Sequence, residues 1–297
     1  MDIVVFGAGS LGSLIGGLLS KTHEVTLVGR QPHVDRINAS GLAITGLRSE
    51  RVKPRAQTDL EGIEADLALV TVKSYDTEAA ARALATASID TVCSLQNGLG
   101  NEEILADTLD CPIIAGTATY GADLTTPGTV SMTGEGAITI GLFRGGDREL
   151  LESIETAFDT AGVGVEVSHE INITLWEKLV VNAAINPVTA LARCRNGSLV
   201  NDPLASIAEQ AAIEAVSVAQ QSGIDLDEEV SIETVFEVAQ VTADNRSSML
   251  QDVLASRRTE IDAINGTVVD RAGTVPVPVN ETLAGLLVGW EREHGIR

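Results

Sequence analysis

The sequence predicts an N-terminal α/β domain over residues 1–168, followed by an all-α domain over residues 169–297. Three observations support this prediction. Short β-branched runs alternate with helical patterns in the first half of the chain, as expected for a parallel sheet covered by helices. A glycine-rich turn joins the first run to the first helical pattern. After Ser168 the strand pattern stops and only helical periodicities follow.

The first strand and helix enclose a glycine motif that is typical of dinucleotide-binding sites. The segment "DIVVFGAGSLG" leads from a buried strand at Ile3–Phe6 through a G-x-G-x-x-G pattern into a helix, and a second strand follows at Glu24–Val28. A bare glycine motif also fits a structural turn, but the strand–turn–helix–strand context favours a Rossmann domain. The expected cofactor contacts are Gly7, Ala8, Gly9, Ser10, Leu11 and Gly12.

The end of the second strand determines the expected cofactor preference. NAD sites usually place Asp or Glu there, on the ribose 2′-hydroxyl. Here the segment Val28–Gln31 contains no acid, and Arg30 offers a planar cation suited to a 2′-phosphate. We therefore expect NADPH as the cofactor and NADH as a weaker alternative. The competing interpretation of Arg30 is an ordinary surface arginine.

Two further predicted strands lead to polar residues. The strand at Asp66–Lys73 ends in Lys73, and the strand at Thr91–Leu95 is followed by Asn97. Ligands bind beyond the carboxyl ends of the strands in an open α/β sheet, so both side chains are expected at the cofactor edge. Taken singly, each also fits a solvated charge or a turn residue. The remaining elements expected in this half are strands at Ile113–Thr117 and Gly164–Val167, a hairpin of Thr129–Met132 with Ala137–Leu142, and a helix at Glu149–Ala161.

The second half contains the helices that are expected to bind the substrate. A long helical pattern over Glu170–Ala192 should break or bend at Pro187. Within it, Lys178, Asn182 and Asn186 recur at four-residue steps on one face of an otherwise apolar helix. Further helices are predicted from Asp202-Pro203, with Asp202 as a cap, and over Ser231–Val238, Asn245–Asn265 and Val279–Glu293.

The predicted helix Asn245–Asn265 has a polar face of its own. Its residues at four-residue spacing are Ser248, Asp252, Ser256 and Glu260, and Asn245 lies one turn before them. A solvated face is the ordinary interpretation of such a pattern. The polar face of Glu170–Ala192, if buried, nevertheless needs polar partners, and this second face is the candidate.

Composition excludes several classes of function. The chain has 42 acidic and 20 basic residues and a net charge of −22, which argues against nucleic-acid partners and anionic membrane surfaces. Such an acidic, lysine-poor composition resembles proteins of organisms with a salt-filled cytoplasm. Three cysteines and four histidines show no metal-ligand spacing, so no metal site is expected. No signal-peptide pattern and no long apolar run occurs, and we expect a cytoplasmic protein.

Five segments resemble the signature segments of ketopantoate reductases, the 2-dehydropantoate 2-reductases of pantothenate and coenzyme A biosynthesis. They occur in family order: "GAGSLG", "TVKSYD", "QNGLG", "LWEKLVVNAAINPVTALARCRNG" and "TADNRSSMLQDVLASRRTEIDAING". The resemblance implies a Rossmann domain and a helical domain with the active site in the cleft between them. It also implies reduction of the 2-keto group of ketopantoate by NADPH, which gives (R)-pantoate.

The resemblance assigns roles residue by residue. Lys178 takes the general-acid position, and Glu260 that of a carboxylate that orients substrate and lysine and also lies at the cofactor. The positions that match substrate contacts are Asn97, Asn182, Asn186, Asn196, Asn245 and Ser248. The positions that match cofactor contacts outside the glycine loop are Arg30, Lys73 and Asn97.

Two other functions remain open at this point. One is a different 2-keto or 3-hydroxy acid dehydrogenase of the same two-domain build. The other is a non-catalytic NADP-sensing protein, against which a buried Lys178 and Glu260 argue, because an idle buried charge is costly. The expected partner is a small-molecule 2-keto acid, and the expected assembly is a monomer or a homodimer.

Overall fold

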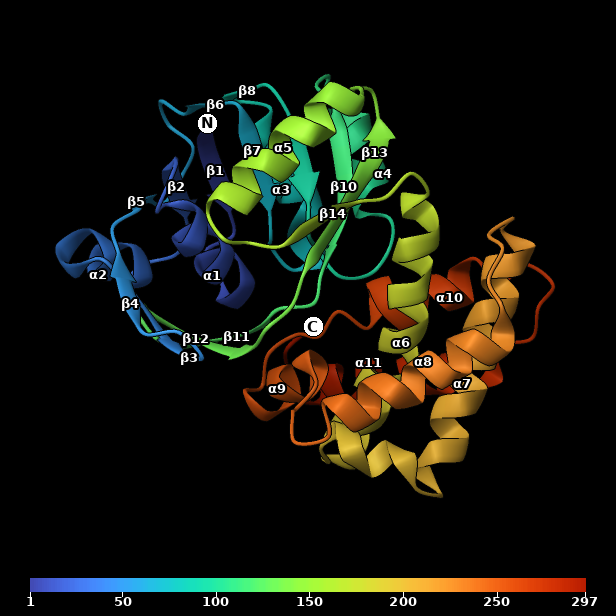
Figure 1. Ribbon diagram of the computed structural model, residues 1–297. Helices are drawn as coiled ribbons and strands as arrows, with labels where there is room; N and C mark the ends of the chain where they lie inside the picture. Colours follow the sequence, from blue (N-terminus) through green and yellow to red (C-terminus); the bar gives the residue numbers. More distant parts are fainter. The chain divides into compact units, whose positions relative to one another are not determined.

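The computed structural model describes residues 1–297 and divides them into two compact units (Figure 1). The first, called here the α/β unit, comprises Met1–Gln96 and Asn101–Ile171. The second, called the helical unit, comprises Asn97–Gly100 and Asn172–Arg297. Strands occur in the first unit and helices dominate the second, which confirms the predicted fold class. No helix in either unit has both the length and the apolar character needed to cross a membrane.

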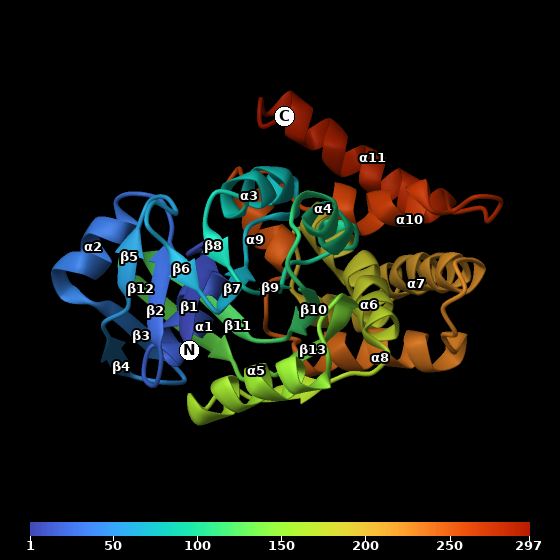
Figure 2. The same ribbon diagram turned by 90° about the horizontal axis from the view of Figure 1, so that it is seen from above.

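The α/β unit is built on an eight-stranded sheet (Figure 2). From one edge to the other its strands are β14 (Val165–Val167), β13 (Ile138–Arg144), β10 (Ile113–Ala118), β9 (Val92–Ser94), β7 (Leu67–Val70), β1 (Asp2–Phe6), β2 (Glu24–Val28) and β5 (Arg55–Gln57). The strands from β10 to β5 are parallel, and β13 runs antiparallel to β10. The central strands are buried on both faces, as expected for parallel strands covered by helices.

Strand β1 shows how the sequence serves both faces of this sheet. Successive side chains of a strand point to opposite faces. Ile3 and Val5 belong to the core on one face, whereas Val4 belongs to the core on the other face. All three side chains are at most 2% exposed. This short run of β-branched residues therefore joins both hydrophobic cores of the unit.

Helices and smaller sheets complete the α/β unit. The helices are α1 (Ser10–Leu19), α2 (His33–Ser40), α3 (Thr77–Leu84), α4 (Asn101–Thr108) and α5 (Arg148–Thr160), with a 3₁₀ turn η1 at Ser74–Asp76. A second sheet has the order β11 (Gly121–Thr126), β12 (Thr129–Gly134), β3 (Leu42–Gly46) and β4 (Glu50–Val52), and β6 (Glu64–Ala65) pairs with β8 (Ser88–Ile89).

Helix α1 packs between the large sheet and the four-stranded sheet. A Cβ atom on Gly16 would lie 2.4 Å from Leu27 of β2, and one on Gly17 would lie 2.9 Å from Leu42 of β3. At either position a Cβ atom would force the neighbouring leucine side chain to shift. Two successive glycines weaken a helix by roughly 1 kcal/mol each relative to alanine, but here they let both sheets approach it. The helix that follows the glycine loop is thereby fixed on two sides.

The predicted hairpin was wrong. Strand β12 pairs antiparallel with β11, across the turn that contains Pro127 and Gly128. Strand β13 instead pairs with β10 in the large sheet. Gly128 has φ +76°, a conformation that suits the turn before β12. The strand on the other side of this turn, β11, was not predicted from the sequence.

The helical unit contains six α-helices and two short irregular helices. They are α6 (Ile171–Ala192), η2 (Asn196–Val200), α7 (Leu204–Gln221), α8 (Glu228–Val241), α9 (Ser248–Leu254), the π-helix η3 (Asp262–Gly266), α10 (Thr267–Asp270) and α11 (Pro278–Glu293). The Asp202 carboxylate was expected to cap α7 by accepting hydrogen bonds from the first backbone N–H groups of that helix. Its carboxylate instead accepts a hydrogen bond from Ser206 Oγ (2.5 Å), and Pro203 occupies the cap position.

The single helix expected over Asn245–Asn265 was also wrong. Helix α9 ends at Leu254, and Ser256 adopts a left-handed conformation with φ +51°. The backbone N–H groups of Ser256 and Arg257 donate to the carbonyls of Val253 and Asp252, the hydrogen-bond pattern of a Schellman motif. This motif usually takes glycine at the left-handed position, so a serine there gave no signal of a helix end.

Helix α6 continues through Pro187, so the break considered for this position does not occur. Proline lacks a backbone N–H, so the carbonyl of Ala183, four residues earlier, loses its helical donor. The side chain of Asn265, in η3, donates from Nδ2 to this carbonyl at 3.0 Å. Asn265 is fully buried, and its amide supplies the hydrogen bond that Pro187 cannot make.

The amide of Asn265 belongs to a buried polar network. It also donates to Oδ1 of Asn280 (2.9 Å), whose own amide donates to Glu214 Oε2 (2.9 Å). Glu214 further accepts hydrogen bonds from the backbone N–H groups of Val279 and Asn280, at the start of α11. A carboxylate in this place suits the first turn of a helix. The network therefore ties α6, α7, η3 and α11 together.

We expect Asn265→Ala to lower the free energy of unfolding by about 1–3 kcal/mol, because it leaves the buried Ala183 carbonyl without a donor. In a Pro187→Ala background the same substitution should cost less, because residue 187 then has an N–H of its own. Urea denaturation of the four proteins of this double-mutant cycle measures both costs. Equal costs in the two backgrounds would show that Asn265 does not compensate for Pro187.

Candidate functional site

The three motif glycines of the α/β unit occupy different environments. A Cβ atom on Gly12 would lie 2.3 Å from the Gly7 carbonyl oxygen and 2.4 Å from Thr71 Oγ1. Gly7 has φ +114° and leaves no room for a side chain beside Val72. A Cβ atom on Gly9 would meet nothing closer than 3.9 Å. Gly7 and Gly12 are therefore needed by the fold, whereas the space at Gly9 is open to a ligand.

The N-terminus of α1 can hold an anion. Helix α1 begins at Ser10, its cap residue Gly9 has no side chain to satisfy the first N–H groups, and its first turn contains no acid. Free N–H groups and the positive end of the helix dipole favour a phosphate at this position. Ser10 Oγ accepts a hydrogen bond from the Leu124 N–H (3.0 Å), which fixes the helix start to β11. Ala8 and Leu11 pack into the core below. The residues of this loop thus fit a dinucleotide.

Arg30 follows β2, as the sequence predicted, and its side chain is 93% exposed. One terminal nitrogen lies 3.8 Å from Oδ2 of Asp76, in η1. Such an exposed pair contributes little to stability, so the guanidinium can exchange this partner for a ligand. The sequence did not predict Asp76 as a neighbour of Arg30, because a residue 46 positions away cannot be placed there without the fold.

A buried histidine supports the segment that contains Arg30. His33 begins α2, and its Nδ1 accepts the Gly128 N–H at 2.9 Å. The proton therefore resides on Nε2, which donates to Ser13 Oγ of α1 at 3.0 Å. Burial lowers the pKa of His33 and keeps the ring neutral. No role was predicted for His33 from the sequence, although its position three residues after Arg30 was an available signal.

Lys73 does not lie within a strand, in contrast to the expectation. Strand β7 ends at Val70, and Lys73 is the half-buried residue that precedes η1. The neighbouring backbone is held by Gln96, whose Nε2 donates to the Val72 carbonyl (3.1 Å) and to Thr77 Oγ1 (2.7 Å). Gln96 lies two residues beyond the end of β9 and is buried. It links the segments that follow β7 and β9, which is a role that the sequence did not reveal.

Helix α6 of the helical unit includes all three residues of the predicted polar face. Lys178 and Asn182 are half-buried, and Asn186 is buried. Their spacing places them on one face, since residues four apart are neighbours on a helix. Thr189 donates from Oγ1 to the Asn186 carbonyl (3.0 Å) and lies 2.7 Å from Ser247 Oγ. This contact fixes the cap of α9 against the C-terminal half of α6.

The polar residues around α9 do not form the face that their spacing predicted. Ser248 is the first residue of α9 and is exposed, as is Asn245. Asp252 is buried and accepts a hydrogen bond from Arg257 Nε (3.0 Å), while Ser256 lies beyond the helix end. The predicted face failed because its second half is not helical.

Asn196 supports the segment before α9. Its backbone N–H donates to the Asn245 carbonyl (3.1 Å), and its Nδ2 donates to Thr242 Oγ1 (2.8 Å). The residue is 7% exposed, and its Oδ1 has no hydrogen-bond donor. These contacts determine the backbone position of Asn245.

The segment Asn97–Gly100 joins the helical unit through η3. Asn97 Nδ2 donates to Glu260 Oε2 at 3.3 Å, and the Leu99 N–H donates to the Ala263 carbonyl at 3.2 Å. Gly98 has φ +83°, and a Cβ atom there would lie 2.4 Å from the same carbonyl. The π-helical geometry of η3 accompanies this approach, and π-helical turns are frequent at functional sites. Glu260 is 5% exposed, so its carboxylate needs the partners that surround it.

Groups of His, Cys, Asp or Glu that could hold a metal ion do not occur in the structure. The residues that could bind an organic cofactor are the glycine loop, Arg30 and Lys73 in the α/β unit. Those for a small polar substrate are the amides, Ser248, Lys178 and Glu260 of the helical unit. Several amides and a carboxylate can bind a small polar acid, and an ammonium beside them can supply a proton to a carbonyl oxygen that is being reduced.

Comparison with known proteins links both units to one family. The family model described as "Ketopantoate reductase PanE/ApbA" matches residues 3–145, and the model "Ketopantoate reductase PanE/ApbA C terminal" matches residues 170–291. The chain is 40% identical over 301 residues to the 2-dehydropantoate 2-reductase of Pyrococcus horikoshii, with 99% of each protein covered. It is 41% identical over 297 residues to that of Halobacterium salinarum, with 97% of this chain and 98% of the relative covered. The crystal structure of a PanE/ApbA family ketopantoate reductase from Ralstonia eutropha JMP134 has a TM-score of 0.92 at 33% identity and covers 99% of this chain and 100% of its own.

The environments of the motif glycines predict two different defects. Gly9→Ala should leave the melting temperature within a few degrees of the wild type, because its Cβ would meet nothing closer than 3.9 Å, and should greatly weaken dinucleotide binding. Gly12→Ala should destabilise the fold itself by about 1–3 kcal/mol through overpacking. Thermal unfolding and the fluorescence of bound reduced dinucleotide separate the two. If Gly9→Ala binds the dinucleotide as tightly as the wild type, the phosphates do not bind at this loop.

Proposed function

We propose that this chain, which belongs to the PanE/ApbA ketopantoate reductase family and reduces 2-dehydropantoate to pantoate, uses NADPH and takes its catalytic proton from Lys178. The observation that supports this site most directly is the hydrogen bond between Asn97 and Glu260. These residues lie 163 positions apart, and the family resemblance assigns both of them to the substrate and cofactor site.

The division of labour follows the two halves of the chain. In this proposal residues 1–168 bind NADPH and residues 169–297 bind the keto acid. The open space at Gly9, the uncapped start of α1 and the exposed guanidinium of Arg30 support the binding of a phosphorylated dinucleotide. When bound, the reduced nicotinamide supplies a hydride to the keto carbon.

Lys178 would act on the carbonyl oxygen of the substrate. As the keto carbon is reduced, negative charge develops on that oxygen. An ammonium at hydrogen-bond distance stabilises this charge and then transfers a proton from Nζ to the oxygen, which gives the hydroxyl of pantoate. The half-buried position of Lys178 on an otherwise apolar helix supports this role, because a low dielectric strengthens the interaction.

Neutral polar groups would hold the rest of the substrate. We propose Asn182, Asn186 and Asn245 as donors and acceptors for its hydroxyl and carboxylate, and Ser248 as a carboxylate donor. Amides and hydroxyls bind these groups without adding charge to the site. Asn196 would act through Asn245, whose carbonyl it holds. Glu260, supported by Asn97, would orient the substrate and Lys178, and Lys73 would lie against the cofactor.

Replacement of Lys178 tests the proton donor. Lys178→Met keeps the aliphatic stem and should lower kcat for ketopantoate about 10²–10⁴-fold, the usual contribution of a positioned acid. The dissociation constant of NADPH should change little, since its proposed ligands are in the α/β unit. The matched control is Lys53→Met, an exposed lysine whose loss should leave kcat unchanged. If Lys178→Met retains wild-type turnover, the ammonium takes no part in the chemistry.

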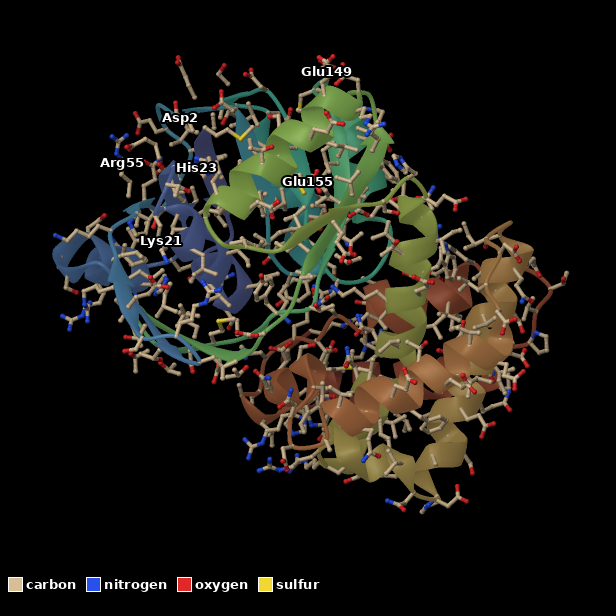
Figure 3. The ribbon with its side chains drawn as sticks, viewed as in Figure 1. Asp2, Lys21, His23, Arg55, Glu149 and Glu155 are labelled. Carbon is tan, nitrogen blue, oxygen red and sulfur yellow. The ribbon has the colours of Figure 1, made fainter.

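Replacement of Arg30 tests the cofactor. Arg30→Ala should weaken NADPH binding by about 1.5–3 kcal/mol, the range for a hydrogen bond to a charged group, and leave NADH binding nearly unchanged. Arg55→Ala is the control, because Arg55 is an exposed arginine on the edge strand β5 (Figure 3). Dissociation constants for both dinucleotides measure the effect. Equal losses for NADPH and NADH would show that Arg30 does not contact the 2′-phosphate.

A further inference from the structure

Glu260 lies in a segment that cannot position it by secondary structure alone. Helix α9 ends at Leu254 and η3 begins at Asp262, and only the backbone carbonyl of Glu260 takes part in the helix that follows, where it accepts from the Ile264 N–H (3.1 Å). The carboxylate of Glu260 is nevertheless buried. Its position therefore depends on contacts that fix the chain on either side of it.

The residue before Glu260 is held by a buried carboxylate. Glu291, near the end of α11, accepts hydrogen bonds from the Thr259 N–H (2.7 Å) and from Thr259 Oγ1 (2.6 Å) through the same oxygen, Oε1. Both side chains are 0% exposed. Thr259 in turn accepts a long hydrogen bond from the Ile261 N–H (3.4 Å).

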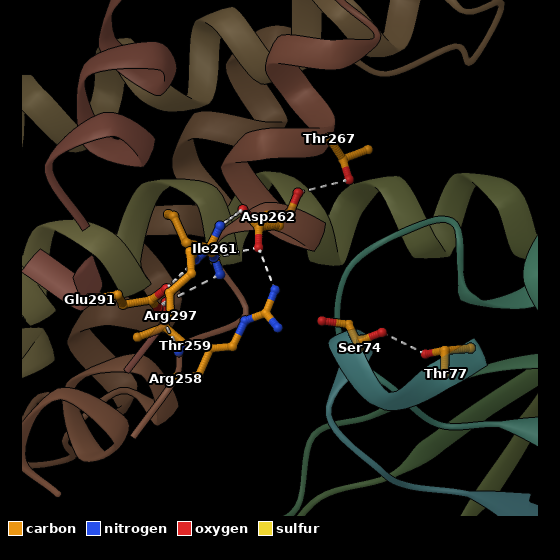
Figure 4. Close-up of polar contacts among 9 residues, drawn as sticks. All are labelled: Ser74, Thr77, Arg258, Thr259, Ile261, Asp262, Thr267, Glu291 and Arg297. Atoms are coloured by element: carbon orange, nitrogen blue, oxygen red, sulfur yellow. Dashed lines mark hydrogen bonds and ion pairs between the residues drawn. The ribbon is translucent and has the colours of Figure 1, made fainter. Parts of the chain in front are cut away.

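Arg297 joins this carboxylate to the residue that follows Glu260 by two positions (Figure 4). Its Nε donates to Glu291 Oε2 (2.9 Å), while Nη1 and Nη2 donate to the two oxygens of Asp262 (3.0 and 2.5 Å). Arg258 adds a contact to Asp262 at 3.2 Å. The Arg297 side chain is only 22% exposed, and the planar fork of arginine makes such a three-contact geometry possible.

The charges of this cluster stabilise one another. Burial opposes ionisation of Asp262, but the hydrogen bonds and charges of Arg297 and Arg258 outweigh it and hold the pKa of Asp262 below its usual range. The hydrogen bond to Asp262 raises the pKa of Arg297 in return. Loss of Arg297 would leave Glu291 as a buried charge without a cation, which is a strongly unfavourable state.

We infer that Arg297 is a positioning residue for Glu260: through Glu291 it fixes Thr259, through Asp262 it fixes the start of η3, and the two contacts together set the place of the carboxylate between them. The inference rests on the proposed function, in which Glu260 orients the substrate and Lys178. Displacement of a catalytic group by about 1 Å reduces rates by as much as 10²-fold. Arg297 thus acts on turnover without contact to substrate.

A double-mutant cycle tests this inference. Arg297→Gln should lower kcat for ketopantoate about tenfold to 100-fold, and Arg297→Lys should recover part of the loss, because lysine cannot hold both carboxylates. In the Glu260→Gln background, Arg297→Gln should cause no further loss of kcat. The matched control is Arg292→Gln, which removes an exposed arginine of α11, the helix that contains Glu291, and should leave kcat unchanged.

The outcomes are distinct. An equal loss of kcat in the presence and absence of the Glu260 carboxylate would make Arg297 a general structural residue and overturn the inference. Wild-type kcat for Arg297→Gln, with Glu260→Gln impaired, would also overturn it and leave the proposed function intact. If Glu260→Gln itself retains wild-type kcat, the role of Glu260 in the proposed function fails and the inference fails with it. Should Arg297→Gln not fold, Asp262→Asn, which removes the charge and one of the two oxygens that accept from Arg297, takes its place in the same cycle.

Discussion

The arrangement of the helical unit depends on one hydrogen bond, from Asn265 to the Ala183 carbonyl. Pro187 lies inside the helix that bears Lys178, Asn182 and Asn186, and an unsatisfied carbonyl at Ala183 would favour breaking that helix at this face. The Asn265 amide removes the penalty and brings η3 against α6. The same π-helical turn presents the Ala263 carbonyl to Leu99 and so brings Asn97 to Glu260. A single amide therefore links the integrity of α6 to the neighbourhood of the candidate carboxylate.

The main constraint on the α/β unit is that a ligand must be able to approach the backbone of the glycine loop. Close packing normally fills every such space. Here Thr71 and Val72 occupy the space that side chains at Gly7 and Gly12 would need. The space beside Gly9 stays open. The neutral ring of His33 connects α1, α2 and the turn at Gly128, so that the glycine loop and the segment after β2 share one support.

Local patterns in the sequence were sufficient for elements whose signals lie within a few residues. Strand β2 has the predicted bounds, and the three polar residues of α6 lie on one helix because their spacing is a property of the helix itself. The prediction failed where the determining contact is distant or chemically unusual. The prediction of one helix over Asn245–Asn265 failed because Ser256 ends the helix in a left-handed conformation that usually requires glycine. Asp76 beside Arg30, and the contacts of Asn265, Glu291 and Arg297, join residues whose proximity only the fold creates.

The assignment of Asn97–Gly100 to the helical unit has a consequence for how such proteins recombine. The chain passes from one unit to the other after Gln96, returns after Gly100 and passes again after Ile171. The two units are therefore not modules that a single cut can separate. A chimera assembled from two homologues with one junction at residue 171 would combine a helical unit with a foreign four-residue segment. Compatibility of that segment with its η3 partner, rather than the sequence at the junction, should decide which parental combinations fold.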